Sequence, residues 1–207
     1  MCGVAGIIDY RGKTNTVTAV GTMLRSFSHR GPDESGVYHS PTATIGNVRL
    51  SIIDLQTGQQ PLSDISGRYW IVFNGEIFNY IELRQELEKK GLRLKTQSDT
   101  EVLVSLFAMF GKNCLKMLNG QFAFAIWDKQ KEELFLARDR VGIRPLFYTI
   151  NNGVLYFGSE IKAIFRNREV KRELDPHSLS QIYTFWTALT PGTAFKDIFE
   201  LSPGHFM

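Results

Sequence analysis

The run Phe122–Trp127 places the strongest constraint on the fold, because every residue in it is apolar. A strand with one face in water alternates apolar and polar residues, so a continuous apolar run indicates a strand covered on both faces. Leu134–Ala137 is a second apolar run, and the polar residues Asp128–Glu133 between the two predict a hairpin. The simplest fold that buries both faces is a pair of stacked sheets with helices outside. We therefore expect an α+β protein built in layers.

Further elements follow from short apolar runs and from helical spacing. Strands are predicted at Val4–Ile8, Thr44–Ile53 and Tyr69–Phe73, and a second hairpin joins Leu146–Ile150 to Val154–Phe157 through Asn151-Asn152-Gly153. Helices are predicted at 17–27, from Tyr80 to Gly91, from Ser98 to Phe110, and from Asp175-Pro176 onward. The tetrad Ser98-Asp99-Thr100-Glu101 has the spacing of a capping box, and Asp175-Pro176 places an N-cap before a proline in the first turn.

Composition excludes several classes of protein. The chain has 207 residues, of which 43% are apolar, so it can bury a core as one large domain. Its cysteines, Cys2 and Cys114, have no zinc spacing and cannot form a disulfide framework, which favours a reducing cytoplasm, with Cys114 as a packing residue. The net charge of +3 comes without a basic run, so we expect no nucleic-acid partner. No apolar stretch approaches the ~20 residues of a membrane helix, and the N-terminus lacks a basic leader region.

Cys2 is the first candidate catalytic residue. Removal of Met1 would leave a thiol and a free α-amine on the same residue, and the amine has an ordinary pKa of about 7.7–8.0. It can therefore act as the base for its own side chain. Gly3 would then leave room for a substrate. The alternative is a small buried residue near a frayed end, and an isolated Met-Cys-Gly start favours that alternative.

Asn74-Gly75-Glu76, directly after a predicted strand, is the second candidate. An enzyme that attacks an amide needs hydrogen-bond donors at the developing oxyanion, and an Asn side chain with a Gly N–H can supply two. Asn-Gly is also the preferred pair of a type I′ hairpin turn, and taken alone it favours the turn.

Arg49 and Asp99 are candidates for binding the two charges of a zwitterionic substrate. A guanidinium binds a carboxylate through two parallel hydrogen bonds. The ordinary alternative for Arg49 is an exposed residue at a strand end. Asp99 can face an amine, alone or with Glu76, although an acid in the first turn of a helix is favoured by the helix dipole alone.

Two charged segments are harder to interpret. His29, within Ser28–Asp33, invites a Cys–His pair, but a structural hydrogen-bond network is favoured because the terminal amine already supplies a base. The alternating charges of Arg138–Leu146 predict either an ion-pair network at a bend, facing a partner domain, or a solvated loop.

Taken in order, these segments resemble the class II glutamine amidotransferases, whose glutaminase domains are N-terminal-nucleophile hydrolases. The similarity is closest to the glutaminase domain of glutamine-hydrolysing asparagine synthetases. Glu76 after Asn74-Gly75, together with His29–Asp33, separates that type from the glucosamine-6-phosphate synthase and phosphoribosyl-pyrophosphate amidotransferase types. The matching segments are Met1–Gly3, His29–Asp33, Arg49–Asp54, Phe73–Asn79, Ser98–Glu101, Gly120–Asp128, Arg138–Leu146, Gly158–Ala163 and Pro203–His205.

The resemblance implies a four-layer αββα sandwich of two antiparallel sheets flanked by helices. It also implies that Cys2 is both nucleophile and base and that a thioester forms. Asn74 and Gly75 would form the oxyanion hole. The substrate-binding residues it implies are Arg49 for the carboxylate, Asp99 and Glu76 for the amine, and Leu50, Ser51, Ile52 and Ile53 along the pocket.

The resemblance further predicts how the chain is organised. Residues 1–190 are expected to be the glutaminase domain and 191–207 the start of a connection to a C-terminal synthetase domain. The glutaminase half needs no metal or cofactor, whereas ATP and Mg are expected only in the synthetase domain, whose Ser-Gly-Gly-x-Asp-Ser loop this sequence lacks. Alternatives are the same glutaminase serving a sugar or polymer precursor, or a catalytically silent binding module. A homodimer is left open, and no membrane partner is expected.

Overall fold

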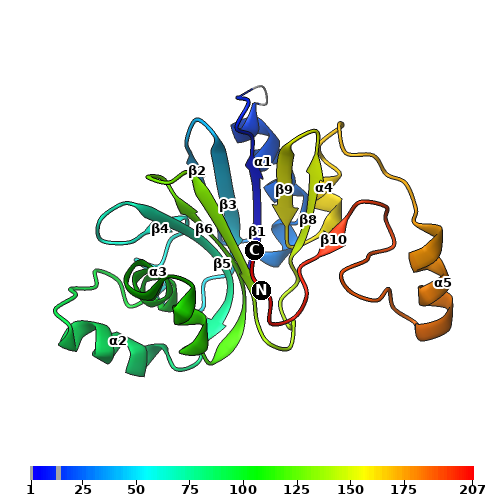
Figure 1. The fold of residues 1–207 in the computed structure, drawn as a ribbon. Helices are drawn as coiled ribbons and strands as arrows, with labels where there is room; N and C mark the ends of the chain where they lie inside the picture. Colours follow the sequence, from blue (N-terminus) through cyan, green and yellow to red (C-terminus); the bar gives the residue numbers. More distant parts are fainter. Residues whose placement is uncertain (1, 13–14) are drawn as a thin grey trace.

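Two antiparallel sheets form the centre of the molecule in this computed structural model, which describes residues 2–12 and 15–207 (Figure 1). The larger, sheet A, has the strand order β10-β8-β9-β1-β3-β2. Its strands are β1 (Gly3–Ile8), β2 (Glu34–His39), β3 (Ala43–Arg49), β8 (Phe147–Asn151), β9 (Val154–Gly158) and β10 (Phe199–Glu200). The predicted hairpin over the turn at Asn151–Gly153 is confirmed as β8–β9.

The second sheet, sheet B, has the order β4-β5-β6-β7. Its strands are β4 (Leu62–Ser63), β5 (Tyr69–Ile77), β6 (Gly120–Asp128) and β7 (Glu133–Arg138). The hairpin predicted from the two apolar runs is confirmed as β6–β7, in which Phe124 lies opposite Ala137. Every strand pair in both sheets is antiparallel.

The non-alternating run in β6 is buried on both faces, as predicted. Ala123, Ala125 and Trp127 belong to the apolar layer between the two sheets, which Val4 and Ile45 share from sheet A. The intervening residues Phe122, Phe124 and Ile126 pack on the opposite face of sheet B, against its helices. Six consecutive apolar residues are therefore explained by one central strand with neighbours above and below.

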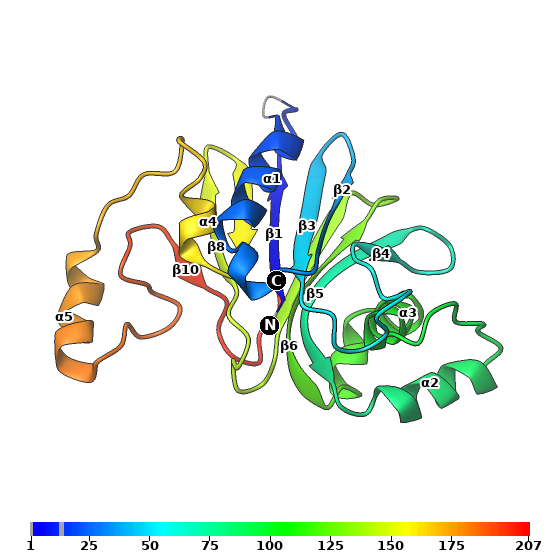
Figure 2. The same ribbon diagram turned by 180° about the vertical axis from the view of Figure 1, so that it is seen from behind.

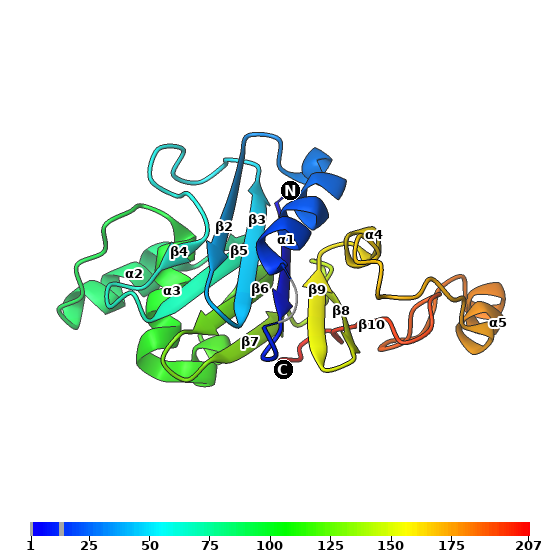
Figure 3. The ribbon, with the colours of Figure 1, turned by 90° about the horizontal axis from the view of Figure 1, so that it is seen from above.

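Helices cover the outer face of each sheet. On sheet A, α1 (Thr16–Ser26) lies over β1 with the short α4 (Ile161–Ile164) beside it (Figure 2). On sheet B, α2 (Tyr80–Lys89) and α3 (Asp99–Phe110) close the other apolar layer. Two 3₁₀ segments, Ser28–Arg30 and Gly111–Lys116, connect elements. The four-layer αββα arrangement is confirmed, and the view from above shows the layers side by side (Figure 3).

Of the capping box predicted at the start of α3, the N-cap is confirmed and the reciprocal contact from Glu101 is not. Ser98 is its N-cap and accepts the Thr100 N–H at 3.0 Å. Glu101 does not complete a capping box, because its carboxylate accepts the N–H groups of Lys95 and Thr96 at 2.8 and 2.6 Å instead. It thereby holds the loop that leads into the helix.

Two strand predictions were wrong at their ends. The strand expected to reach Ile53 ends at Arg49, where the chain turns into a loop. The strand expected to end at Phe73 continues to Ile77, so Asn74 and Gly75 lie within β5, opposite Ala123 and Phe122. The hairpin-turn interpretation of Asn74-Gly75 is therefore incorrect. β2 was missed because its Ser and Gly residues give little strand signal.

Helix α5 (Pro176–Phe185) stands apart from the sandwich at the edge of the molecule (Figures 1 and 3). Asp175 caps it as predicted, accepting the His177 and Ser178 N–H groups. Among the described residues, none of its side chains belongs to the three apolar clusters. We call residues 175–194 the α5 arm. Its two ends are joined by a hydrogen bond in which the Asp175 N–H donates to the Ala194 carbonyl at 3.0 Å.

The last residues run along both sheets. β10 pairs with β8 of sheet A, and Met207 then exchanges two backbone hydrogen bonds with Leu136 at the edge of sheet B. Across the described residues, no helix combines the length and the apolar character that crossing a bilayer requires.

Candidate active site

A pocket lies where β1, β3 and β5 meet the start of α3. Cys2 enters it just before β1, Arg49 at the end of β3, and Asp99 in the first turn of α3. The predicted site residues that line it are Cys2, Arg49, Leu50, Ile52, Ile53, Asn74, Gly75, Glu76 and Asp99. Ser51 lies on the same loop but outside the lining, and its N–H donates to the Asp33 carboxylate at 2.8 Å.

Cys2 is partly buried beside the first strand of sheet A. Its Sγ lies 3.6 Å from the Leu50 carbonyl oxygen, to which the thiol donates. The expectation that Gly3 leaves room for a substrate is wrong, because a Cβ there would stand 2.6 Å from the Phe27 ring and 3.3 Å from Cδ of Arg30. Glycine is required at this position so that these side chains can pack under the nucleophile candidate. Met1 lies outside the described residues.

Asn74 points an unsatisfied amide into the interior. It is 1% exposed, and neither its Nδ2 nor its Oδ1 has a hydrogen-bond partner among the described residues. A buried polar group left in this state costs about 1–3 kcal/mol. Such groups are rare in folded proteins, and one that lines a pocket is available to hydrogen-bond a substrate.

Gly75 offers its backbone N–H at the same place. The N–H and the C=O of Phe122 both pair with Asp139, so the opposing Gly75–Phe122 pair is non-hydrogen-bonded. The Gly75 N–H therefore points away from β6. On that edge of β5, Gln60 accepts the Phe73 N–H at 2.7 Å and Asp99 accepts the Ile77 N–H at 3.1 Å. The Gly75 N–H emerges between these two pocket residues.

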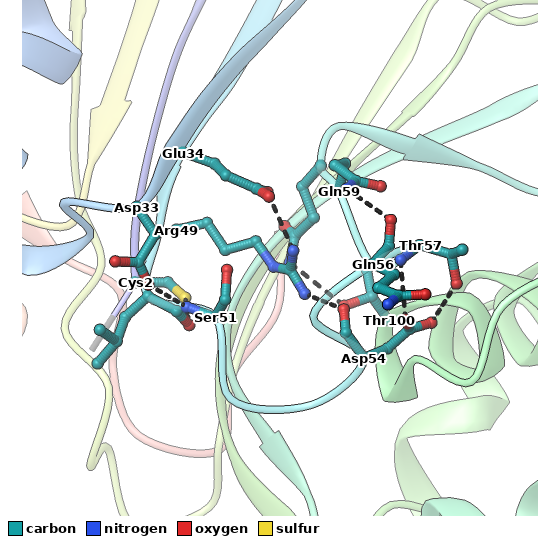
Figure 4. A network of polar contacts seen from close by, with 12 residues as sticks. Cys2, Asp33, Glu34, Arg49, Ser51, Asp54, Gln56, Thr57, Gln59 and Thr100 are labelled. Atoms are coloured by element: carbon teal, nitrogen blue, oxygen red, sulfur yellow. Dashed lines mark hydrogen bonds and ion pairs between the residues drawn. The ribbon is translucent and has the colours of Figure 1, made fainter.

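Arg49 is buried rather than exposed at a strand end, with 4% of its surface accessible. Its guanidinium pairs with the Glu34 carboxylate at 3.0 Å. Its other terminal nitrogen donates to the carbonyls of Ile53 and Asp54 at 2.9 and 2.6 Å (Figure 4). A Cβ on Gly58 would come within 2.6 Å of that nitrogen, so the loop closes tightly around it. The sequence pattern did not reveal Glu34 as a partner.

The loop after Arg49 joins sheet A to the start of α3. The Asp54 carboxylate accepts the N–H groups of Thr57 and Gln97 at 2.8 and 2.7 Å. Although partial burial works in the opposite direction, these hydrogen bonds hold the pKa of Asp54 below its usual range. Gln60 donates to Thr100 Oγ1 at 3.2 Å. The loop therefore crosses the pocket and is fixed at both ends.

Asp99 is the titratable group most changed by the fold. It is 5% exposed, and burial, with a further contribution from the charge of Glu76, raises its pKa from 3.8 to about 6. The N–H groups of Ile77 and Thr100 oppose the rise. A cationic group placed in the pocket would favour the ionised carboxylate.

His29 does not reach the pocket. Its Nε2 lies 3.1 Å from Glu160 Oε1, which also pairs with Arg30 at 3.2 Å. The structural-network interpretation of His29 is therefore confirmed, and the Cys–His pair is not formed. Arg30 in turn donates from Nε to the Cys2 carbonyl at 3.0 Å.

The segment Arg138–Leu146 forms a bend that is held by an ion pair to Glu200 and by hydrogen bonds to backbone groups, rather than a network of ion pairs among its own charges. Arg138 pairs with Glu200 at 2.7 Å, and the buried Asp139 accepts the N–H groups of Val141 and Ile143. Arg144 also lines the pocket. Cys114 packs in the core beneath α3, and burial raises the pKa of its thiol to about 12.

Sequence reasoning missed part of the lining. Ser98 and Thr100 were identified only as part of a capping box and Phe73 only as a strand residue, and Gln60 was not identified at all. The missed lining residues are Gly58, Gln60, Phe73, Ser98, Thr100 and Arg144. For Arg144, the available signal in the sequence was its place in the charged segment Arg138–Leu146.

Comparison with known proteins places this pocket in context. Residues 1–207 match the family model described as glutamine amidotransferase domain. The chain is 41% identical to asparagine synthetase [glutamine-hydrolyzing] 1 of Bacillus subtilis, over 99% of this chain and 33% of the relative. It is 39% identical to asparagine synthetase [glutamine-hydrolyzing] 3 of the same organism, over 99% of this chain and 34% of the relative. The chain therefore spans about a third of the length of these relatives.

A solved structure shares the fold. The glutamine phosphoribosylpyrophosphate amidotransferase of B. subtilis, complexed with ADP and GMP, superposes with a TM-score of 0.68 and 28% sequence identity. The match covers 79% of this chain and 43% of that protein.

Proposed function

The chain belongs to the glutamine amidotransferase family, and we propose that it hydrolyses the side-chain amide of L-glutamine to glutamate and ammonia through a thioester on Cys2. One observation carries the proposal most directly. The buried Asn74 amide has no partner among the described residues, yet it lines the same pocket as the Cys2 thiol. A donor placed in this way is what an oxyanion requires.

The chemistry follows from what these residues can donate and accept. Once Met1 is removed, the α-amine of Cys2 takes the thiol proton and the thiolate attacks the amide carbon of glutamine. Asn74 Nδ2 and the Gly75 N–H stabilise the oxyanion of the tetrahedral intermediate. The α-ammonium then protonates the amide nitrogen of the intermediate, the C–N bond breaks, and ammonia leaves. Water attacks the γ-glutamyl thioester, releases glutamate and restores the thiol.

Substrate binding is assigned to the charged residues around the rim. Asp99 and Glu76 face the α-ammonium of glutamine, since a buried carboxylate gains most from a cationic partner. Arg49 binds the α-carboxylate through the donors that Glu34 and the loop carbonyls leave available. Leu50, Ile52 and Ile53 surround the rest of the substrate.

The ammonia has a proposed destination. Both B. subtilis relatives are named asparagine synthetases and extend well beyond the region matched here. We propose that ammonia passes to an ATP-dependent synthetase domain, in which ATP and Mg belong. A sugar or polymer precursor as acceptor is the second candidate. The first is favoured because His29–Asp33 and Glu76 follow the asparagine synthetase type.

The test combines intact mass, glutamate release and a glutamine-like electrophile such as diazo-oxo-norleucine. We expect a chain without Met1, steady glutamate formation, and a single adduct on Cys2. Cys114 is the internal control, because burial and a pKa of about 12 make it unreactive. A processed chain with neither turnover nor adduct would contradict the proposal and favour the silent binding module.

Retention of Met1 gives a second test of the mechanism. A chain that keeps Met1 has the Cys2 nitrogen in a peptide bond, so the base is absent. We expect such a chain to release no glutamate. Full turnover by a chain shown by mass to retain Met1 would rule out the terminal amine as the base.

A further inference from the structure

Cys2 lies just before β1, at the N-terminal end of the chain, where a residue is hard to hold in place. When Met1 is removed it becomes the first residue of the chain, and chain ends fray unless other groups tie them down. A nucleophile must stay close to its attack geometry, since a displacement of about 1 Å can lower the rate by ~10²-fold. Some part of the fold must therefore fix the backbone of residues 2–4.

The segment that follows β9 lies beside these residues. Gly158 is the last residue of β9 and pairs with Ala5 of β1. Beyond it, the Ser159 N–H donates to the Val4 carbonyl and Ser159 Oγ accepts the Val4 N–H, both at 2.9 Å. The ladder is thus extended by one residue toward the start of the chain. It stops short of Cys2 itself.

Cys2 is reached by side chains instead. Arg30 Nε donates to the Cys2 carbonyl at 3.0 Å. The Arg30 side chain is only 11% exposed, and its ion pair with Glu160 Oε1 at 3.2 Å fixes the guanidinium. Glu160 occupies the N-cap position of α4, yet its side chain makes no capping hydrogen bond there. Both of its oxygens face cations, with Lys162 Nζ 2.8 Å from Oε2.

We propose that Glu160 is a positioning residue for the Cys2 nucleophile, acting through Arg30. The proposal rests on the proposed role of Cys2. Without Glu160, a mostly buried guanidinium loses its partner, and a buried charge in that state rearranges or takes up water. The Cys2 carbonyl then loses its donor, and Cys2, which lies just before β1, can fray. Glu160 itself touches neither the pocket nor the substrate.

Two of the three side chains that contact Glu160 supply matched controls. Lys162 and His29 both pair with Glu160, but their side chains are 49% and 59% exposed and neither contacts Cys2. Lys162→Ala and His29→Ala therefore disturb the same carboxylate and leave the Arg30–Cys2 contact in place. Exposed pairs of this kind contribute little to stability.

The experiment measures kcat and KM for glutamine in the wild-type chain and in Glu160→Gln, Lys162→Ala and His29→Ala, with thermal unfolding of each. Glu160→Gln keeps the shape of the side chain and removes its charge. We expect kcat to fall by about 10- to 100-fold in this variant, with KM changed less than about 3-fold. The two control variants are expected to stay within about 2-fold of wild type.

Two alkylating reagents give a readout that simple destabilisation would not reproduce. Diazo-oxo-norleucine needs the aligned site, whereas iodoacetamide needs only an accessible Cys2. In Glu160→Gln we expect the first reaction to slow while the second keeps or exceeds its wild-type rate. Wild-type kcat in Glu160→Gln would overturn the inference, as would an equal loss in Lys162→Ala or a parallel loss of both alkylations. An inactive wild-type chain would instead contradict the proposed function.

Discussion

The two walls of the pocket differ in how their polar groups are satisfied before any ligand arrives. On the sheet A side, the Arg49 guanidinium already bonds Glu34 and two loop carbonyls. On the sheet B side, the Asn74 amide has no partner among the described residues, and burial raises the pKa of Asp99 to about 6. The Arg49 guanidinium thus has most of its donors paired within the protein, whereas neither polar atom of the Asn74 amide is paired among the described residues.

The difference separates groups that fix the shape of the pocket from groups that are available to a substrate. A satisfied buried group fixes the geometry around it, and Arg49 does so for the loop that crosses the pocket. An unsatisfied group weakens the folded state until a ligand supplies what is missing. Such groups persist where binding or reaction needs them. Asn74 on the sheet B wall is therefore expected to affect mainly kcat, whereas Arg49 on the sheet A wall is expected to affect mainly KM and the order of the loop.

The largest effect is expected from the nucleophile, which stands between the two walls. Cys2→Ala should lower kcat by roughly 10⁴-fold or more, as removal of a nucleophile does in other hydrolases. Glutamine binding should survive, because neither wall is altered, and calorimetric titration measures it. Loss of binding together with turnover would show that the thiol shapes the pocket as well as reacting.

Asn74→Ala tests the unsatisfied wall directly. Losing one oxyanion donor typically lowers kcat by ~10²–10³-fold. The folded state should keep its stability within about 1 kcal/mol, because no protein hydrogen bond is broken. Steady-state kinetics measures the change in kcat, and thermal unfolding measures the change in stability. A large fall in melting temperature with normal kcat would place Asn74 on the structural side of the comparison.

Arg49→Ala tests the satisfied wall. We expect glutamine binding to weaken by about 1.5–3 kcal/mol, the usual loss for a charged hydrogen bond, so that KM rises roughly 10- to 150-fold. Glu34→Gln is the matched variant, since it leaves the guanidinium in place and removes only its ion partner, and its KM should change less. An unchanged glutamine affinity in Arg49→Ala would remove this residue from the binding site and leave it a purely structural role.

Asp99→Asn should give the smallest kinetic change, with effects of opposite sign on binding and stability. The folded pKa of about 6 lies above the ordinary 3.8, so the folded protein holds this proton more tightly. Asp99 therefore lowers stability progressively as pH rises through that interval, by about 1–3 kcal/mol when complete. Above pH 6 the Asn variant should unfold at a higher temperature than wild type but bind glutamine roughly tenfold more weakly.

Wild-type kinetics test the same titration. Since glutamine pairs with the ionised carboxylate, its KM should rise as pH falls through about 6. A KM that stays constant from pH 8 to pH 5 would contradict the pairing of Asp99 with the substrate amine.

Elements with strong local signals were predicted correctly from the sequence. The unbroken run in β6 required two covering layers, and the four predicted helices exist within a residue or two of their expected bounds. The predicted ends of β3 and β5 were wrong because contacts with residues outside each strand determine where it ends. Arg49 turns the chain by bonding carbonyls beyond it, and β6 extends the pairing of β5 through Gly75. Gly75 must be glycine there, because a Cβ would meet the Gln121 carbonyl at 2.1 Å.

The candidate site divides in the same way. Residue types with a distinctive chemistry, such as Cys2 and Arg49, were recognised from motifs. Glu34 and Glu160 were not recognised as partners, because they are distant in sequence from the arginines they contact and a motif does not show which side chains meet. Gln60 and Thr100 belong to the same group, since only the loop that crosses the pocket brings them together.

The α5 arm gives this protein a built-in optical reporter. Trp186 ends α5 with 93% of its surface exposed, whereas Trp127 is fully buried between the sheets and Trp70 is partly buried and stacks on Tyr38. Indole emission shifts to longer wavelength in water, and a small quencher such as acrylamide reaches only exposed rings. Emission from Trp186 should therefore be red-shifted and readily quenched, and emission from Trp127 should be neither. A partner that binds the α5 arm would reduce the acrylamide quenching of the red-shifted Trp186 emission, so binding could be detected without an added label.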